Sequence, residues 1–305
     1  MKRLMSMLLI LMLLVLPAAA EEYRIKVSSP NGAPGIALAM LAVEAPEDYT
    51  YVAAEAITAE FAGAKADFII APINAGAKLY KAGKSSYQLA AVVTWGNLYF
   101  ASQRADFKPE DMNGAEVTLF GENTINASVA LYALEQNGIV PAKVNYLAGA
   151  ANTQSLLLSD ENAIVVTAEP ALTAASMKND RITSYALNDL YEKATGFNGY
   201  AQAGLFVNPA TVQAHPDAVA EYLQQAEKAV SLCATDVDAV AHAAVALEIL
   251  PNAKVAGQAI PRCALRFVSA VEAREQIEKT AEIDLSQYGG ALPADDFYYE
   301  APAAK

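Results

Sequence analysis

Short apolar runs alternate with helix-like segments along most of the chain, and this alternation predicts the fold. Residues 23–29 alternate between apolar and polar side chains, as a half-buried strand does. Residues 66–71 and 115–120 are strand-like runs, each followed by a segment with helical spacing. Residues 216–279 are predicted to be mostly helical. Strands that alternate with helices indicate mainly parallel sheets flanked by helices, and therefore an α/β fold.

The stretch from Tyr87 to Gln103 (YQLAAVVTWGNLYFASQ) organises the rest of the chain. It begins as a buried strand, breaks at Gly96-Asn97, a pair that turns easily, and then resumes as a second short strand. Strand–helix units precede and follow it, so we expect the chain to cross here from one lobe to another. Residues 201–207 are the candidate return crossing. The predicted architecture is two-lobed, with lobe 1 formed by residues 21–98 and 205–305 and lobe 2 by residues 99–204.

The loops at the ends of the predicted strands hold the candidate ligand-binding residues. Ligands of open α/β sheets lie beyond the carboxyl ends of the strands, where such loops converge. The candidates are Ser29, Asn31, Asn74, Trp95, Asn97, Tyr99, Asn123, Thr124, Gln154 and Glu169. A helix is predicted to start after Thr124, and its free N–H groups suit a ligand oxygen. Alternatively, the Asn side chains only cap turns and helices, and Trp95 belongs to the core.

The first twenty residues have the pattern of an export signal. Lys2 and Arg3 precede an apolar run at residues 4–16, and an A-x-A site ends before Glu21. This run is shorter than the roughly twenty residues that span a bilayer. No Cys follows it, so no lipid anchor is expected. We expect cleavage near Ala20-Glu21 and a periplasmic or secreted mature chain, with an uncleaved anchor as the alternative.

The charge and the missing motifs exclude several classes of function. Loss of Lys2 and Arg3 takes the formal net charge from −13 to −15, and an acidic surface argues against nucleic acid and anionic membranes. The sequence has no G-x-S-x-G elbow, P-loop or G-x-G-x-x-G fingerprint, and its two His residues form no cluster. We therefore expect no enzymatic activity, no cofactor and no metal.

Cys233 and Cys263 are the two cysteines of the chain. In an oxidising compartment they would pair, and the resulting disulfide would contribute roughly 3–4 kcal/mol to stability. The alternative is two buried thiols.

Five segments of the chain together carry a resemblance to a known family: ADFIIAPINAGAKLYKAG, VVTWGNLYFAS, TAEPALTAA, GLFVNPATVQAHPDAV and GGALPADDFYYE. The chain resembles the substrate-binding proteins of ABC importers, in the nitrate/sulfonate/bicarbonate-type group that also holds thiamine-pyrimidine-precursor binders. The resemblance implies a type II periplasmic-binding-protein fold with a hinged cleft. It also implies a small-molecule ligand and delivery to a membrane permease. A monomer that closes by hinge bending is expected.

The residue types in the cleft loops narrow the expected ligand. Glu169 accompanies Trp95 and Tyr99, and the nearest basic residue is Arg104, just beyond the crossing strand. A carboxylate beside aromatic rings suits a flat, neutral or amine-bearing ligand, so a pyrimidine-like heteroaromatic is favoured. The alternatives are an alkanesulfonate or nitrate binder, a ligand-sensing docking protein without a transport role, and a secreted enzyme.

Overall fold

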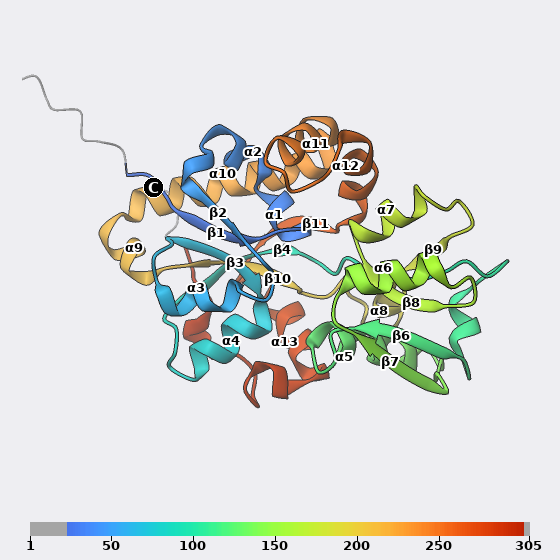
Figure 1. The fold of residues 1–305 in the computed structure, drawn as a ribbon. Coiled ribbons are helices and arrows are strands. Elements are labelled where there is room, and N and C mark those ends of the chain that lie inside the picture. The colour runs from blue at the N-terminus through green and yellow to red at the C-terminus, as the bar shows by residue number, and fades with distance from the viewer. Residues whose placement is uncertain (1–22, 302–305) are drawn as a thin grey trace, which may run out of the picture.

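The computed structural model describes residues 23–301, and two β-sheets with their flanking helices stand side by side in it (Figure 1). The predicted two-lobed α/β architecture is confirmed. The predicted export signal lies outside the described residues.

The first sheet belongs to lobe 1 and has six strands in the order β11-β4-β10-β3-β1-β2. Its strands are β1 (Val27–Pro30), β2 (Tyr49–Val52), β3 (Phe68–Pro72), β4 (Gln88–Thr94), β10 (Ala203–Val207) and β11 (Leu265–Ser269). β1 pairs in parallel with β2 and β3, whereas β10 runs antiparallel to β3 and β4. The carboxyl ends of β1 to β4 therefore meet at one edge of the sheet, which faces lobe 2.

The second sheet belongs to lobe 2 and has five strands in the order β7-β6-β8-β5-β9. Its strands are β5 (Leu98–Ser102), β6 (Glu116–Phe120), β7 (Lys143–Leu147), β8 (Ile164–Ala168) and β9 (Thr183–Ala186). β6 pairs in parallel with β7 and β8, and β5 runs antiparallel to β8 and β9. Strands of each sheet mostly share one direction. The reversed strands are β5 and β10, which enter from the other lobe, and β11, which runs antiparallel to β4.

Helices cover both faces of each sheet (Figure 1). Lobe 1 carries α1 (Ala33–Ala37), α2 (Ala39–Glu44), α3 (Ile57–Gly63), α4 (Ile73–Lys81), α9 (Pro209–Ala214), α10 (Pro216–Thr235), α11 (Val237–Ala246), α12 (Ala253–Ala259) and α13 (Arg274–Ile283). Lobe 2 carries α5 (Ile125–Gln136), α6 (Ala150–Ser159), α7 (Ala171–Ser176) and α8 (Leu187–Thr195). Short 3₁₀ turns are η1 (Pro46–Asp48), η2 (Pro109–Met112), η3 (Ile260–Arg262), η4 (Leu285–Tyr288) and η5 (Asp295–Phe297). The mostly helical prediction for residues 216–279 missed β11, which lies at an edge of the first sheet.

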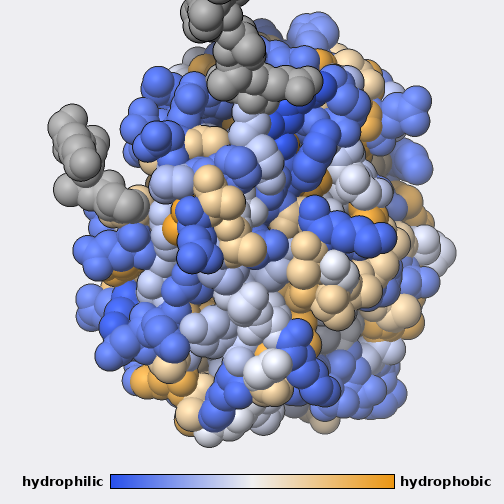
Figure 2. All heavy atoms as spheres, turned by 90° about the vertical axis from the view of Figure 1, so that its left-hand side faces the viewer, coloured by the Kyte–Doolittle hydropathy of each residue, from blue (hydrophilic) through white to orange (hydrophobic). Residues whose placement is uncertain are grey.

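The surface of lobe 1 is mixed rather than apolar. Figure 2 shows the end of the molecule that lies at the left in Figure 1, where hydrophilic residues predominate and apolar ones form small groups. Between residues 23 and 301, no single helix is long and apolar enough to cross a membrane. α10 and α11 pass that test only as a pair, and they are bent by 112° at the break between them.

The kinked stretch crosses between the sheets as predicted, because β4 lies in the first sheet and β5 in the second. Gly96, in the kink, has φ +80°, and a Cβ there would lie 2.5 Å from the Tyr200 ring and 2.6 Å from Asn188 Oδ1. The amide of Asn188 donates to the carbonyls of Trp95 and Gly96, each at 2.9 Å. Only glycine fits this position, since it tolerates both the left-handed backbone and the crowding.

Candidate functional site

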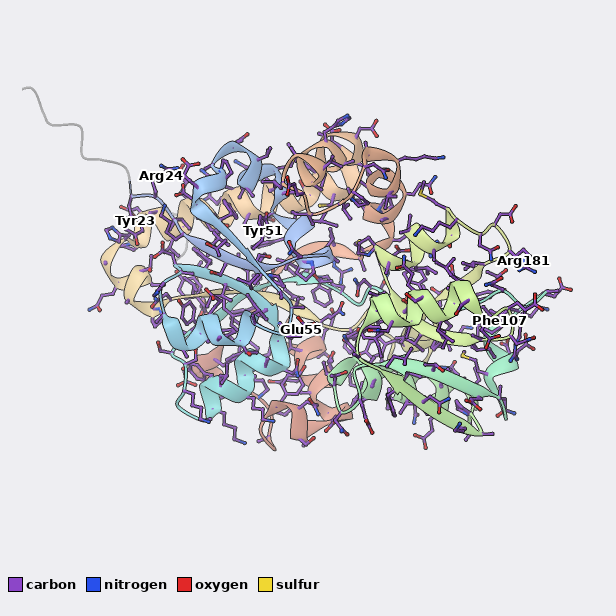
Figure 3. The ribbon with its side chains drawn as sticks, viewed as in Figure 1. Tyr23, Arg24, Tyr51, Glu55, Phe107 and Arg181 are labelled. Atoms are coloured by element: carbon purple, nitrogen blue, oxygen red, sulfur yellow. The ribbon has the colours of Figure 1, made fainter. Side chains whose placement is uncertain are left out.

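A cleft of about 300 Å³ lies between the lobes, at the edge where β1, β2 and β3 end. Its polar lining consists of Asn31, Asn74, Asn97, Thr124, Asn126, Gln202 and Gln287. Its apolar lining consists of Pro30, Pro34, Ala54, Ile57, Pro72, Ala75, Ile125 and Ala203. None of these side chains is ionisable. Figure 3 shows the cations Arg24 and Arg181 near the outer ends of the two lobes, far from this cleft.

A second hollow of about 330 Å³ lies on the outside of lobe 1, between α2 and α10. It is lined by the carboxylates of Glu44, Asp48, Asp217 and Glu221. Asp48 is already paired with Arg24 and Lys26. No residue of lobe 2 lines this hollow, so lobe movement does not close it. The cleft between the lobes is therefore the better candidate site.

Four of the predicted residues line the cleft: Asn31, Asn74, Asn97 and Thr124. Asn31 directly follows β1, and Asn74 lies in the first turn of α4, directly after β3. Thr124 caps α5, since its Oγ1 accepts from the backbone N–H of Ala127 at 3.4 Å. These residues meet because β1 and β3 end at one edge of the first sheet, α5 begins in lobe 2 opposite this edge, and Asn97 lies in the crossing between the lobes.

Hydrogen bonds fix Asn97 in the crossing between the lobes, but its side-chain oxygen has no partner within residues 23–301. Its side chain is among the buried polar ones, with the residue 6% exposed. Its Nδ2 donates to the carbonyl of Glu169 at 2.8 Å, and its backbone N–H donates to Gln202 Oε1 at 3.3 Å. The Oδ1 atom has no hydrogen-bond partner among the described residues, and the same is true of Asn74 Oδ1. Buried acceptors are normally satisfied, so unpaired ones in a cleft point to a missing donor.

Three polar residues of the lining were not predicted: Asn126, Gln202 and Gln287. Asn126 Oδ1 accepts from the Tyr200 hydroxyl at 2.9 Å and from Gln202 Nε2 at 3.4 Å. Burial raises the pKa of Tyr200 well above its usual value, so this phenol stays protonated and donates. Gln287 Nε2 donates to the Asn123 carbonyl at 3.0 Å across the lobes. The position of Asn126 in the first turn of the predicted helix was the sequence signal available.

Glu169 and Tyr99 do not line the cleft but meet Arg262, which comes from η3 of lobe 1. Arg262 Nε lies 2.5 Å from Glu169 Oε1, and Glu169 Oε2 accepts from the Thr173 N–H at 3.1 Å. The guanidinium lies 4.4 Å from the centre of the Tyr99 ring and donates to Ser184 Oγ at 3.0 Å. Burial raises the pKa of Tyr99 to about 12, and its hydroxyl donates to the Arg262 carbonyl. These contacts join the two lobes at one side of the hinge.

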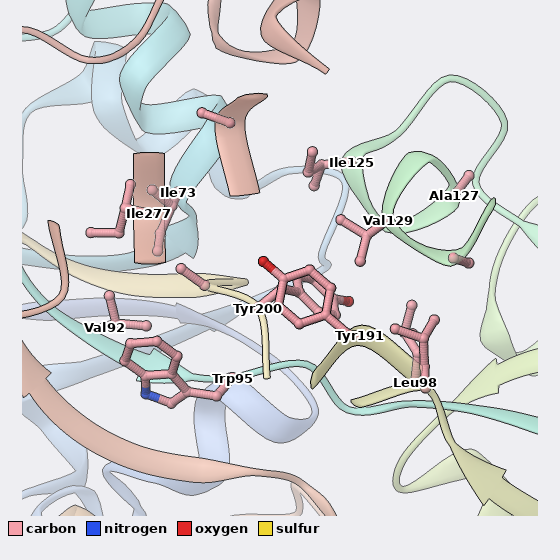
Figure 4. Close-up of a cluster of buried hydrophobic side chains, with 14 of the residues drawn as sticks. Ile73, Val92, Trp95, Leu98, Ile125, Ala127, Val129, Tyr191, Tyr200 and Ile277 are labelled. Atoms are coloured by element: carbon pink, nitrogen blue, oxygen red, sulfur yellow. The ribbon is translucent and has the colours of Figure 1, made fainter. Parts of the chain in front are cut away.

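Trp95 packs into the hydrophobic cluster behind the cleft. The residue is 2% exposed, and Figure 4 shows its ring near Val92 and Tyr200 in this cluster. Its Nε1 donates to the Arg266 carbonyl at 2.8 Å, and the Arg266 guanidinium lies 4.4 Å from the ring centre. The structure therefore places Trp95 in the core, and it does not line the cleft.

The three remaining predicted residues have local roles. Ser29 is buried, and its hydroxyl donates to the carbonyl of Pro30 at 3.1 Å. Asn123 has φ +58°, and it offers its carbonyl rather than its side chain to Gln287. Gln154 Nε2 donates to the Ala171 carbonyl at 2.7 Å and thereby holds α6 against α7. None of them lines the cleft.

The predicted disulfide is not formed. Cys233 and Cys263 are free, buried thiols in one hydrophobic cluster with residues of α11 and α12. Burial raises the pKa of Cys233 to about 12 and that of Cys263 well above its usual value. Both sulfurs are therefore neutral at physiological pH. Within residues 23–301, no group of three or more His, Cys, Asp or Glu side chains is arranged to hold a metal ion.

Residues 65–239 match the family model described as "NMT1/THI5 like". No curated protein sequence matches the chain. The structure is similar to that of an ABC transporter protein from Parabacteroides distasonis, with 22% identity, a TM-score of 0.78, and coverage of 91% of this chain and 99% of that one. It is also similar to the periplasmic aliphatic sulphonate binding protein SsuA from Escherichia coli, with 14% identity and a TM-score of 0.70 over 92% and 93% of the two chains.

A third similar structure is the Candida albicans CA3427 gene product, described as having the generic periplasmic binding protein fold. It shares 11% identity at a TM-score of 0.54, over 90% of this chain and 93% of that one. At these identities the likeness shows the fold, and that fold agrees with the two lobes and the cleft described above.

Proposed function

This chain belongs to the NMT1/THI5-like family, and from that premise we propose that it is an exported solute-binding protein of an ABC importer. It captures a small organic molecule in the cleft between its lobes and delivers it to the membrane permease. The proposed location is the periplasm, where the structurally similar SsuA is found.

One observation carries the proposal: an uncharged cleft whose polar lining comes from both lobes and contains unpaired acceptors. Asn31 and Asn74 come from lobe 1, Thr124 and Asn126 from lobe 2, and Asn97 and Gln202 from the two crossings. A ligand that bonds both sets stabilises the closed arrangement over an open one, as hinged binding proteins require.

We propose an uncharged, pyrimidine-like heteroaromatic as the ligand. The cleft has no Lys or Arg side chain, and its volume of about 300 Å³ is at the lower end for small-molecule pockets. Amide groups satisfy the ring nitrogens and exocyclic groups of such a ligand. Glu169 is not available to an amino group of the ligand, because Arg262 and the Thr173 N–H occupy its oxygens.

An alkanesulfonate is the second candidate. The first turn of α5, capped by Thr124 and followed by Ile125 and Asn126, lies at the cleft. The N-terminus of a helix of this length attracts an anion without any charged side chain. The unpaired oxygens of Asn74 and Asn97 oppose an anion, and this is why we place it second.

Two measurements test the proposal. Native mass spectrometry of gently purified protein is expected to detect one bound small molecule per chain. Calorimetry with cytosine, 4-amino-2-methylpyrimidine, methanesulfonate and taurine then compares the two ligand classes. Binding of the sulfonates alone would overturn the pyrimidine assignment.

Transport is tested separately. Cells that lack the gene should lose uptake of the bound solute, and the wild-type gene should restore it. Intact uptake in such cells would favour a sensing role over delivery to a permease.

A further inference from the structure

We infer that Gln202 fixes the orientation of the Asn126 amide, so that the cleft, which also presents Asn97 Oδ1, selects a neutral ligand carrying both a donor and an acceptor, such as a lactam. The inference rests on the proposed ligand-binding role of the cleft. It names Gln202 as a positioning residue that acts through Asn126.

The orientation of the Asn97 amide is determined by a backbone carbonyl. The Glu169 carbonyl can only accept, so the atom of Asn97 that approaches it at 2.8 Å must be Nδ2. Oδ1 is therefore the atom left without a partner in a residue that lines the cleft and is only 6% exposed. The Asn97 side chain therefore has an unused hydrogen-bond acceptor and no unused donor.

The orientation of the Gln202 amide is determined in the same way, by a backbone N–H. The Asn97 N–H can only donate, so the atom of Gln202 that lies 3.3 Å from it must be Oε1. The other end of the amide is then Nε2, which lies 3.4 Å from Asn126 Oδ1. Gln202 therefore accepts a hydrogen bond from the backbone N–H of Asn97 and donates one to Asn126 of lobe 2.

The orientation of the Asn126 amide follows from two donors. Gln202 Nε2 and the Tyr200 hydroxyl both approach Oδ1, the latter at 2.9 Å. A carbonyl oxygen has two lone pairs, and these two donors use both. Only Nδ2 of the Asn126 amide therefore remains for the ligand, and this atom is a hydrogen-bond donor.

The cleft consequently presents opposite polarity on the two sides of Gln202. Asn97 Oδ1 requires an N–H or O–H of the ligand, and Asn126 Nδ2 requires a carbonyl oxygen or ring nitrogen. Asn74 Oδ1, which also lines the cleft, is a second unpaired acceptor. A ligand with only acceptors leaves both Asn oxygens unsatisfied, and leaving a buried polar group unpaired discriminates strongly.

A matched pair of probes tests this polarity. 4(3H)-Pyrimidinone has an N–H next to its carbonyl, and 3-methyl-4(3H)-pyrimidinone lacks that hydrogen. Titration followed by ligand-observed NMR is expected to show at least tenfold tighter binding of the first probe to the wild-type protein. Equal binding of the two, or no binding of either, would overturn the inferred polarity.

Substitution of Gln202 tests its role as the positioning residue. Gln202→Glu can still accept from the Asn97 N–H but cannot donate to Asn126 as a carboxylate. It is expected to weaken the binding of both probes at least tenfold, because each carries a carbonyl that accepts from Asn126 Nδ2. Gln154→Glu, a substitution of the same type outside the cleft, should leave the binding of both probes unchanged. Unchanged affinities in folded Gln202→Glu protein, with its thermal transition intact, would contradict the role of Gln202.

If Gln202→Glu proves unfolded, Asn126→Asp provides the second variant. It replaces the donor Nδ2 by an acceptor and should weaken the binding of 4(3H)-pyrimidinone by a similar factor, whereas unchanged binding would count against the inference.

Native mass spectrometry separates the proposed binding role from the inferred polarity. A co-purifying solute with no preference between the probes would retain the binding role and overturn only the polarity.

Discussion

At the scale of single residues, the contact between Glu169 and Arg262 links the lobes through an unequal pair. The Glu169 side chain is 0% exposed and that of Arg262 is 38% exposed. Removal of the guanidinium leaves a buried carboxylate without its partner, and loss of one member of a buried pair costs about 3–5 kcal/mol. The exposure of Arg262 places the expected loss for Arg262→Ala at the lower end, about 3 kcal/mol of unfolding free energy.

A double-mutant cycle in urea measures this coupling. The variant that combines Arg262→Ala with Glu169→Gln should recover part of the loss, because no buried charge remains. Lys143→Ala breaks an exposed pair with Glu116 and should change stability by less than about 1 kcal/mol. Additive effects at Glu169 and Arg262 would mean that the pair contributes nothing beyond its separate contacts.

The two thiols supply another prediction at this scale. Cys233 and Cys263 are buried, and burial raises the pKa of each above the ordinary value of 9.0. A thiol reagent at pH 8 should therefore leave the native protein unmodified and should label two thiols per chain in denaturant. Labelling of none in denaturant would instead reveal a disulfide.

The same pKa shifts give the sign of a pH dependence. The folded state holds these protons more tightly than the unfolded state does. The corresponding stability is complete below pH 9 and should be lost as the pH rises toward 12. Urea titrations between pH 8 and pH 10.5 are expected to show falling stability, and Cys233→Ser should reduce that slope.

The sequence indicates which residues lie at the cleft where the backbone alone places a side chain. Asn31, Asn74 and Asn97 follow strands, and strand ends converge whatever the side chains do. Glu169 does not line the cleft, and the sequence does not indicate this, because the Arg262 that occupies its carboxylate lies 93 residues away along the chain. Gln287 was missed for the same reason, since only the fold brings η4 of the chain's last segment to α5.

At the scale of elements, the kink at Gly96 is the feature on which both lobes depend. Gly96→Ala would combine a positive φ with contacts of 2.5–2.6 Å to Tyr200 and Asn188. Gly83, which ends the turn after α4, has φ +65° but open space around its missing Cβ. Gly83→Ala should therefore cost only about 1 kcal/mol through backbone strain. Gly96→Ala should cost clearly more, because the neighbours must also shift.

Thermal unfolding of the two variants separates strain from crowding. A Tm loss for Gly96→Ala no larger than that for Gly83→Ala would show that the Tyr200 ring and the Asn188 side chain move aside without cost. In that case the kink would not be rigidly held, and the hinge would lie elsewhere.

The sequence predicts a strand or helix well where the segment itself has a clear pattern of apolar and polar residues. β4 and β5 are continuous apolar runs with a Gly-Asn break, so their sequence alone indicates strand, kink and strand. β11 has no such pattern: it is partly exposed throughout and pairs with β4 through a shifted register. Its strand conformation depends on pairing with β4. The sequence pattern of the segment alone therefore placed it in the region predicted to be mostly helical.

At the scale of the whole molecule, side-chain hydrogen bonds join the lobes on two sides of the crossings. On one side, Arg262 of lobe 1 bonds Glu169 of lobe 2. On the other side, Ser128 Oγ of α5 donates to Asp284 Oδ2 at 2.8 Å, and Gln287 bonds the Asn123 carbonyl. Although burial raises the pKa of Asp284, hydrogen bonds from Ser286 and Ser128 bring it below the usual range, so it accepts as a carboxylate. The cleft lies beside the second of these contacts, because Gln287 lines it.

Ligand binding should therefore be coupled to closure of the two lobes in a monomeric protein. Small-angle scattering is expected to show a smaller radius of gyration when the solute identified by native mass spectrometry saturates the cleft. Ser128→Ala removes the hydrogen bond to Asp284 between the lobes at a residue that does not line the cleft, and it should weaken the binding of that solute about fivefold, or about 1 kcal/mol, mainly through faster dissociation. Asp295→Ala breaks an exposed ion pair with Arg274 within lobe 1 and serves as the matched control. A radius of gyration that stays constant at saturation would mean that the lobes are already closed in the free protein, and Ser128→Ala would then have no effect on dissociation.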